Sequence, residues 1–276
     1  MIYIRLTNGF GNNLFQYNAA CVLARFHNTE VLAMPPYRDY YAIECLGKIG
    51  VKFGDPNHSD LKSVNGDKEY VQSFNKKLHG QDILLSGYFE DYRFYLSSRE
   101  SLMSNFPDVK KRSDKDLVFH LRTGDRLFMK NEFFLKPKPE DYISAINNFK
   151  FNRLHIVTDL PKWETVTKDK LSKMRFHINV PNSESVPIEH SVSYLNSLIE
   201  ALEVFNPIVQ RRSVGEDFNF IRTFDNILFE HGTMSWWAAF LSKATKVGVY
   251  GPWRPWKEAS NKNLSSVPLN NWFKWK

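Results

Sequence analysis

Short apolar runs alternate with helical patterns along the chain, most regularly in its second half. Runs of β-prone residues at 117–121, 154–157 and 247–250 have the length of buried strands. Between them, apolar side chains recur every three or four residues, as in packed helices, at 139–146, 192–205 and 234–244. Strands separated by helices in this rhythm predict a parallel, doubly wound sheet, so we expect the fold class to be α/β.

The first half of the chain carries fewer signals. Apolar patterns predict strands and helices at residues 2–6, 14–24, 31–34, 83–86 and 96–106. Between residues 37 and 75, turn residues interrupt the pattern repeatedly. Residues 107–115 are charged and proline-led, which is typical of a linker. We therefore predict two lobes, at residues 1–112 and 113–276.

Three further segments of the second half have weaker patterns. Residues 176–180 favour a strand, and a polar loop is expected around residues 211–219. Residues 226–231 resemble the end of a helix, followed by a turn at Gly232 and Thr233.

Polar residues follow the apolar run at 117–121 at once. His120, Arg122 and Asp125 would come to the C-terminal edge of a strand, which is where open α/β sheets bind ligands. Arginine suits a phosphate there, because its planar guanidinium stays charged and donates two parallel hydrogen bonds. Asp125 could instead hold Arg122 or His120 in place, and a strand that ends in a solvated polar turn would give the same pattern.

Two segments of the first half could also face a ligand. Gly9, Gly11 and Asn12 lie in a glycine- and asparagine-rich turn between a strand and a helix, which gives the backbone close access to a phosphate or sugar. A plain strand-to-helix turn is the alternative. Residues 87–94 form an aromatic, charged loop that could stack on sugars or serve packing between the lobes.

Composition narrows the class of protein. With 42% hydrophobic and 24% charged residues the chain is an ordinary globular protein, although 15% of its residues are aromatic. The net charge of +7 favours an anionic partner, which could be a nucleotide, a nucleic acid or a membrane surface. No nucleic-acid-binding motif and no long basic run is present, so we expect no nucleic acid partner.

The cysteines and the apolar runs of the sequence indicate the cellular compartment of the protein. Cys21 and Cys45 are the only cysteines, and they have neither metal-ligand nor disulfide spacing, which indicates buried thiols in a reducing compartment. No run approaches the roughly 20 apolar residues that a membrane span needs. We expect a cytoplasmic protein without stable membrane insertion.

Four segments, in this order, resemble the fucosyltransferase superfamily, most closely the α-1,2-fucosyltransferases of glycosyltransferase family eleven. Residues 9–17, GFGNNLFQY, are similar to the opening GxGNxxFQY element, and residues 120–125, HLRTGD, resemble HxRRxD. Residues 156–159, IVTD, resemble the family's strand-end (S/T)D segment. Residues 235–241, SWWAAFL, look like SxxSWW(A/G)A. The resemblance spans nearly the whole chain.

The resemblance implies a GT-B-like architecture of two Rossmann-like lobes facing a cleft. Residues 1–112 would form the acceptor-side lobe, and residues 113–276 the lobe that binds the nucleotide sugar. It also implies an inverting transferase of glycan biosynthesis that moves L-fucose from GDP-fucose onto a glycan hydroxyl. A metal-independent reaction without a cofactor is expected, with charge on the leaving diphosphate stabilised by fixed cations and backbone donors.

The resemblance assigns roles to particular residues. Arg122 would bind the pyrophosphate, and Asp159 would accept hydrogen bonds from guanine. The set of predicted donor-binding residues is Gly11, Asn12, His120, Arg122, Thr123, Asp159, Ser235 and Trp236. Tryptophans in such a position are more often core residues than ligand contacts, because indoles are readily buried, and this alternative applies to Trp236 and Trp237.

One position departs from the family pattern. The family has two adjacent arginines, and Thr123 stands in the place of the second. One guanidinium fewer would weaken leaving-group stabilisation unless a nearby cation such as Arg126 or Lys130 replaces it. GDP-fucose is the first choice of donor, and two alternatives stay open: another sugar nucleotide, or a protein that binds sugar nucleotides without catalysis.

Several carboxylates could deprotonate the acceptor hydroxyl. Asp125 and Glu132 lie nearest to the arginine motif and, with Arg122, make up the predicted catalytic set. Glu90 and Asp91 in the first lobe are further candidates, because the acceptor would bind there.

Overall fold

The computed structural model of the chain describes residues 1–7, 9–35, 40–56, 61–75, 81–112, 115–128, 136–160, 162–173, 186–230, 232–250 and 268–276. The chain divides into two compact units, each of which is treated by itself below. Unit 1 consists of residues 1–110, 213–222 and 233–242, and unit 2 of residues 111–212, 223–232 and 243–276. The first break therefore lies inside the predicted linker, and two segments from the second half of the chain belong to unit 1.

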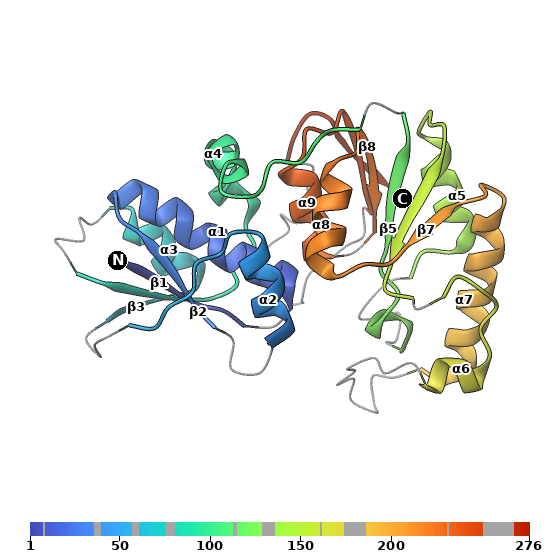
Figure 1. Cartoon of the computed structure of the whole chain (residues 1–276), viewed down its shortest axis with the longest axis horizontal. Coiled ribbons are helices and arrows are strands. Elements are labelled where there is room, and N and C mark those ends of the chain that lie inside the picture. Colours follow the sequence, from blue (N-terminus) through green and yellow to red (C-terminus); the bar gives the residue numbers. More distant parts are fainter. Residues whose placement is uncertain are drawn as a thin grey trace. The chain divides into compact units, whose positions relative to one another are not determined.

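Unit 1 is built on a four-stranded sheet with the strand order β2-β1-β4-β3 (Figure 1). All its pairings are parallel. The strands are β1 (Ile2–Arg5), β2 (Val31–Met34), β3 (Lys62–Asn65) and β4 (Ile83–Ser86). The helices are α1 (Phe10–His27), α2 (Tyr40–Lys48), α3 (Gly66–Ser73), η1 (Tyr92–Phe94), η2 (Leu96–Ser98), α4 (Arg99–Met103), α8 (Val214–Arg222) and α9 (Thr233–Phe240).

The core of unit 1 joins α1 to α9. The ring of Phe15 lies 5.1 Å from that of Trp236, 4.9 Å from that of Trp237 and 5.8 Å from that of Tyr95, measured between centroids. All four side chains are buried. Aromatic side chains of this size dominate the energy of a core, so the tryptophan pair near the end of the chain completes the hydrophobic interior of the unit that begins it.

Unit 2 is built on a six-stranded parallel sheet with the strand order β10-β9-β8-β5-β6-β7 (Figure 1). The strands are β5 (Leu117–Leu121), β6 (Leu154–Thr158), β7 (Ile208–Gln210), β8 (Asn226–Phe229), β9 (Lys246–Tyr250) and β10 (Trp272–Trp275). The helices are η3 (Asp125–Phe128), α5 (Pro139–Asn147), α6 (Lys168–Lys173) and α7 (Ile188–Glu203). β5 is a central strand with every residue buried, as its continuous apolar run predicts.

The expected α/β class with parallel sheets is confirmed. The strands predicted near residues 2–6, 31–34, 83–86, 117–121, 154–157 and 247–250 are present, as are the helices predicted near residues 14–24, 96–106, 139–146, 192–205 and 234–244. How the two lobes face each other stays a prediction, as does the assignment of acceptor and donor to them. The strand predicted at residues 176–180 lies outside the described residues.

Two local predictions are wrong. Residues 226–231 are not a helix end: β8 (Asn226–Phe229) is a strand between β9 and β5, and its enclosure on both sides removes the alternation by which a strand is recognised. Residues 211–219 are not a loop, because α8 occupies Val214–Arg222. Phe218 and Ile221 are buried in it, and so are the polar side chains of Asp217 and Arg222, which is why a polar composition does not exclude a helix here.

No helix in the described parts of the chain is long and apolar enough to cross a lipid bilayer.

Candidate functional site

The C-terminal ends of β5 and β6 bring four predicted residues to one edge of the six-stranded sheet of unit 2. Leu121 of β5 is in register with Thr158 of β6, so the segments that follow the two strands start side by side. His120 lies at the end of β5, Arg122 and Thr123 follow it, and Asp159 follows β6. Carboxyl ends of parallel strands are where α/β sheets bind ligands.

Thr123 and Asp159 are hydrogen-bonded to each other. The backbone N–H of Thr123 donates to Oδ1 of Asp159 over 2.8 Å, and the hydroxyl of Thr123 donates to the same oxygen. Thr123 is buried, whereas Asp159 is exposed. Thr123 therefore holds the carboxylate of Asp159 at the edge of the sheet, where Asp159 is exposed to solvent.

His120 is neutral in this environment. Burial lowers the pKa of His120 to about 4, and Arg122 adds to that effect while Asp159 opposes it. A neutral imidazole has one donor and one acceptor nitrogen, so it can bind a hydroxyl or a nucleobase without adding charge. The electrostatic influence of Arg122 on His120 also places that guanidinium in the same group of side chains.

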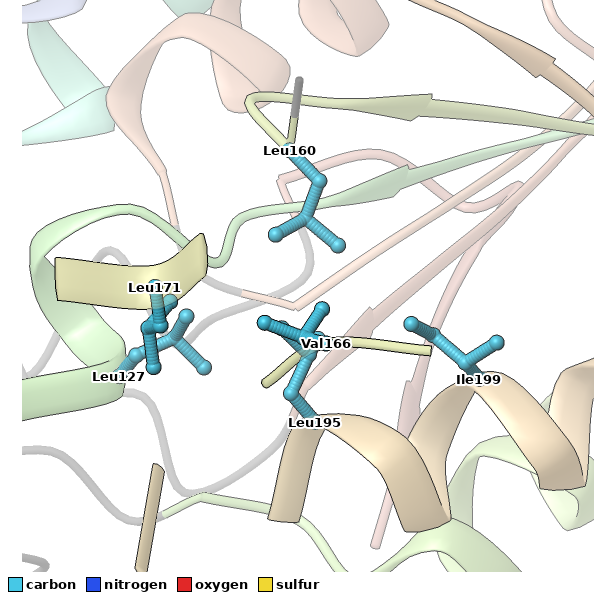
Figure 2. Packing of buried hydrophobic residues seen from close by; sticks show 6 residues of the cluster. All are labelled: Leu127, Leu160, Val166, Leu171, Leu195 and Ile199. Atoms are coloured by element: carbon cyan, nitrogen blue, oxygen red, sulfur yellow. The ribbon is translucent and has the colours of Figure 1, made fainter. Parts of the chain in front are cut away.

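A hydrophobic cluster supports the segments that carry these side chains. Leu160 follows Asp159, and Leu127 belongs to η3 just after Thr123. Figure 2 shows both leucines in a cluster of six buried residues that includes Leu171 of α6 and two residues of α7: Leu127, Leu160, Val166, Leu171, Leu195 and Ile199. Because such packing restricts side chains to few rotamers, it fixes the direction in which the neighbouring polar residues leave the sheet.

Sequence reasoning missed a second polar group at this edge. Glu230 directly follows β8 and is buried, and the hydroxyl of Tyr142 donates to its Oε2. The hydroxyls of Tyr142 and Tyr194 lie 3.2 Å apart. Burial lowers the pKa of Lys136 to about 8 against the opposing effect of Glu230, and its Nζ donates to the Leu127 carbonyl over 2.7 Å.

The signal for Glu230 was present in the sequence. An acidic residue follows the apolar run at the ends of both β6 and β8, but the run of β8 is so short that its pattern also resembles a helix end. Correct recognition of the strand would have placed Glu230 at the same edge as Asp159.

The other predicted donor residues lie in unit 1, where the N-termini of α1 and α9 meet. The sequence predicts Gly11 and Asn12 in a turn before the helix, but they belong to the first turn of α1, because the helix already begins at Phe10. A Cβ on Gly11 would come within 2.3 Å of the backbone nitrogen of Met234, so only glycine allows this approach. Asn12 Oδ1 accepts a hydrogen bond of 2.9 Å from the hydroxyl of Thr233. Ser235, in the first turn of α9, is buried.

Trp236 does not lie where a ligand could reach it. Its side chain has no exposed surface and stacks on Phe240, with 4.8 Å between the centroids. Trp236 therefore packs the core of unit 1, and we correct its predicted role as a donor contact.

Gln16 organises the C-terminal edge of the four-stranded sheet. Its Oε1 accepts from the backbone N–H of Thr7, which follows β1, and its Nε2 donates to the carbonyl of Gly87, which follows β4. Both bonds are 2.9 Å long. The glutamine of the FQY segment thus connects two strand ends that are far apart in the sequence.

The structure describes the candidate catalytic carboxylates to different extents. Asp125 begins η3, and the structure describes its backbone only. Glu132 lies outside the described residues. Asp91 caps η1: its carboxylate accepts from the backbone N–H of Arg93 over 3.0 Å and from the guanidinium of the same residue. Glu90, next to it, is buried without such a partner in the described chain.

A search of the described residues for three or more His, Cys, Asp or Glu side chains able to hold a metal ion gives no such group. Independence of metal stays a prediction.

Comparisons with known proteins include a likeness to a solved structure. No protein-family model matches the chain, and no curated protein matches it. Among solved structures, the chain is similar to a mutant of FUT1 from Arabidopsis thaliana in complex with GDP. The likeness covers 93% of this chain and 70% of that one, with 7% sequence identity and a TM-score of 0.45. At this level, function has to be argued from the residues of the chain itself.

Proposed function

We propose that the protein is a glycosyltransferase, and specifically that it moves L-fucose from GDP-fucose onto a hydroxyl of a glycan acceptor with inversion at the sugar carbon. The observation that carries the proposal is the polar group at the ends of β5 and β6, where Arg122 stands beside a neutral His120 and the Thr123–Asp159 pair. The resemblance of four sequence segments to the α-1,2-fucosyltransferases supplies the choice of sugar.

Each residue of this group has a task in the proposed reaction. Negative charge builds on the diphosphate as its bond to the sugar breaks, and Arg122 would stabilise that charge by paired hydrogen bonds. Asp159 faces solvent and Thr123 bonds only its Oδ1, so its Oδ2 would accept from the N1–H or the amino group of guanine. Neutral His120 would bind the nucleoside without repelling the arginine.

The proposal can be tested by removing the guanidinium. Arg122→Ala is expected to lower the rate of transfer from GDP-fucose by about 100-fold, the usual effect of losing one group that stabilises transition-state charge. Arg153→Ala is the matched control, because Arg153 is an exposed arginine of the same unit. Near-normal transfer by the Arg122→Ala protein would remove the central role given to this residue.

A second candidate is a donor other than GDP-fucose, and Thr123 favours it. The hydroxyl of Thr123 is committed to Asp159, and a guanidinium that the family places there is missing. Thermal-shift measurements with GDP, UDP, CDP and ADP, and then with their sugars, decide between the donors. Stabilisation by UDP alone would change the donor and leave the reaction class in place. Stabilisation by a donor without turnover would instead identify a binding protein that has lost catalysis.

A further inference from the structure

Glu90 is a buried carboxyl group whose surroundings differ from those of its neighbour Asp91. Glu90 is 4% exposed, and no hydrogen bond or ion pair joins its side chain to the described residues. Asp91 is equally buried but is satisfied by the Arg93 backbone and guanidinium. A buried polar group without a partner is rare in a folded protein and calls for a physical reason.

The carboxyl of Glu90 is not sealed inside the unit. The described polar atoms that are both fully enclosed and unbonded do not include its oxygens. The whole residue is 4% exposed, so only a small part of the carboxyl end reaches the surface.

The loop that carries Glu90 belongs to the C-terminal edge of the four-stranded sheet. Gly87, at the start of this loop, accepts a hydrogen bond from Gln16 of α1. A Cβ on Gly87 would lie 3.1 Å from the backbone nitrogen of Gly66, which follows β3. The segments after β3 and β4 are thus in backbone contact, and this edge is the ligand-binding edge of parallel sheets.

Phe89, directly before Glu90, has a backbone φ of 54°, a region that bulky residues rarely adopt. Two contacts hold it there: the hydroxyl of Tyr95 donates to its carbonyl, and its ring lies 5.0 Å from that of Tyr70. A strained residue persists only where its surroundings over-determine it, and such residues gather at functional sites. The strain here fixes the direction in which Glu90 leaves the loop.

The charges around Glu90 oppose its ionisation. Burial, with a smaller contribution from Asp67 in the first turn of α3, raises the pKa of Glu90 to about 7. Tyr95, from the segment between η1 and η2, faces the same group and keeps its proton, because burial raises its pKa well above the usual range. On the loop of Glu90 itself, Asp91 and Arg93 neutralise each other. A carboxyl in this setting is poised to exchange a proton near neutral pH.

We propose that Glu90 is the base that takes the proton from the acceptor hydroxyl, in a carbohydrate-binding site formed by this sheet edge of unit 1. The inference deepens the proposed function and rests on it. As the O–H bond of the acceptor breaks, its proton passes to the Glu90 carboxylate. The oxygen bonds to the anomeric carbon of the sugar, and the bond from that carbon to the diphosphate breaks, with its electron pair leaving on the diphosphate.

The experiment compares Glu90→Gln and Glu90→Asp with wild type and with Glu100→Gln, which removes an exposed carboxylate from the same unit. Transfer of fucose from GDP-fucose to an array of soluble oligosaccharides is followed between pH 5 and 9. Wild-type kcat is expected to rise through about pH 7 and then level off, as for a base of that pKa.

Glu90→Gln is expected to lower kcat by about 100-fold or more, with the KM for GDP-fucose within about two-fold, the usual loss for a general base. Glu90→Asp should restore part of the rate, because a carboxylate is present again. Wild-type kcat and an unchanged pH profile in Glu90→Gln would overturn the inference while leaving the proposed function standing. A wild-type protein that transfers to no oligosaccharide would overturn the proposed function, and this inference with it.

Discussion

The unfolding free energy of a Glu90→Gln variant tests whether the Glu90 carboxyl is buried. This test needs no assay of sugar transfer. Burial raises the pKa of Glu90 from 4.5 to about 7 in the folded chain, whereas the unfolded chain keeps the ordinary value. Between these two pH values the folded protein holds a proton that the unfolded protein has released, so stability falls as the pH rises. The stability that the protonated Glu90 contributes to the fold is fully present below pH 4.5 and is lost above pH 7.

The size of the effect follows from the shift. The difference between about 7 and 4.5 is about 2.5 pH units, and each unit is worth 1.36 kcal/mol, so ionising Glu90 costs the folded state about 3 kcal/mol. Glutamine has similar volume and never ionises. Glu90→Gln should therefore match wild type near pH 4.5 and exceed its unfolding free energy by about 3 kcal/mol at pH 8.

The measurement is urea unfolding at pH steps from 4.5 to 8.5, followed by circular dichroism, for wild type, Glu90→Gln and Glu100→Gln. The unfolding free energy of wild type is subtracted from that of each variant at the same pH, which cancels the titration of all other groups. For Glu100→Gln this difference should be small at every pH, because Glu100 is exposed. A difference for Glu90→Gln that stays constant across the range, or a variant less stable than wild type at pH 8, would refute the reasoning. Either result would mean that the carboxylate is solvated or paired.

Three further predictions concern the other residues of the candidate site. Gly11→Ala should lower the unfolding free energy by about 3 kcal/mol, since its Cβ would stand 2.3 Å from the Met234 nitrogen; a thermal melt equal to wild type would contradict the close contact. Thr123→Val removes the hydroxyl bond to Asp159 and should weaken GDP binding about five-fold in calorimetry, a loss of about 1 kcal/mol; unchanged affinity would detach Thr123 from the nucleotide. Because burial lowers the pKa of His120 to about 4, wild type should lose about 3 kcal/mol relative to His120→Gln as the pH falls from 6.5 to 4, measured by urea unfolding at each pH. Parallel curves would mean that His120 has the same pKa in the folded and the unfolded chain.

The sequence predicts the strands of the sheet best where apolar runs are continuous. β5 is recovered with its bounds, because a central parallel strand is apolar throughout and is followed at once by polar residues. β8 has the same burial but only four residues, and a run so short is compatible with either a strand or a helix end. The position of Glu230 was lost with it.

Which side chains meet depends on tertiary structure and is harder to predict. The strand-end pattern marks Arg122 and Asp159 as site candidates, but nothing local indicates that the hydroxyl of Thr123 donates to Asp159. Trp236 is a core residue because its ring packs on that of Phe15, which belongs to α1 and lies far away in the sequence. Long-range packing of this kind leaves no trace in the spacing of neighbouring residues.

The return of α8 and α9 to unit 1 determines when that unit can finish folding during synthesis. Its core takes Trp236 and Trp237 from residues 233–242, which leave the ribosome only after most of unit 2 has been made. A nascent chain that ends at residue 212 therefore exposes the apolar surface around Phe15 that those indoles later cover. Early translation products of this protein should depend on chaperones, because half-built cores of this kind are prone to aggregate.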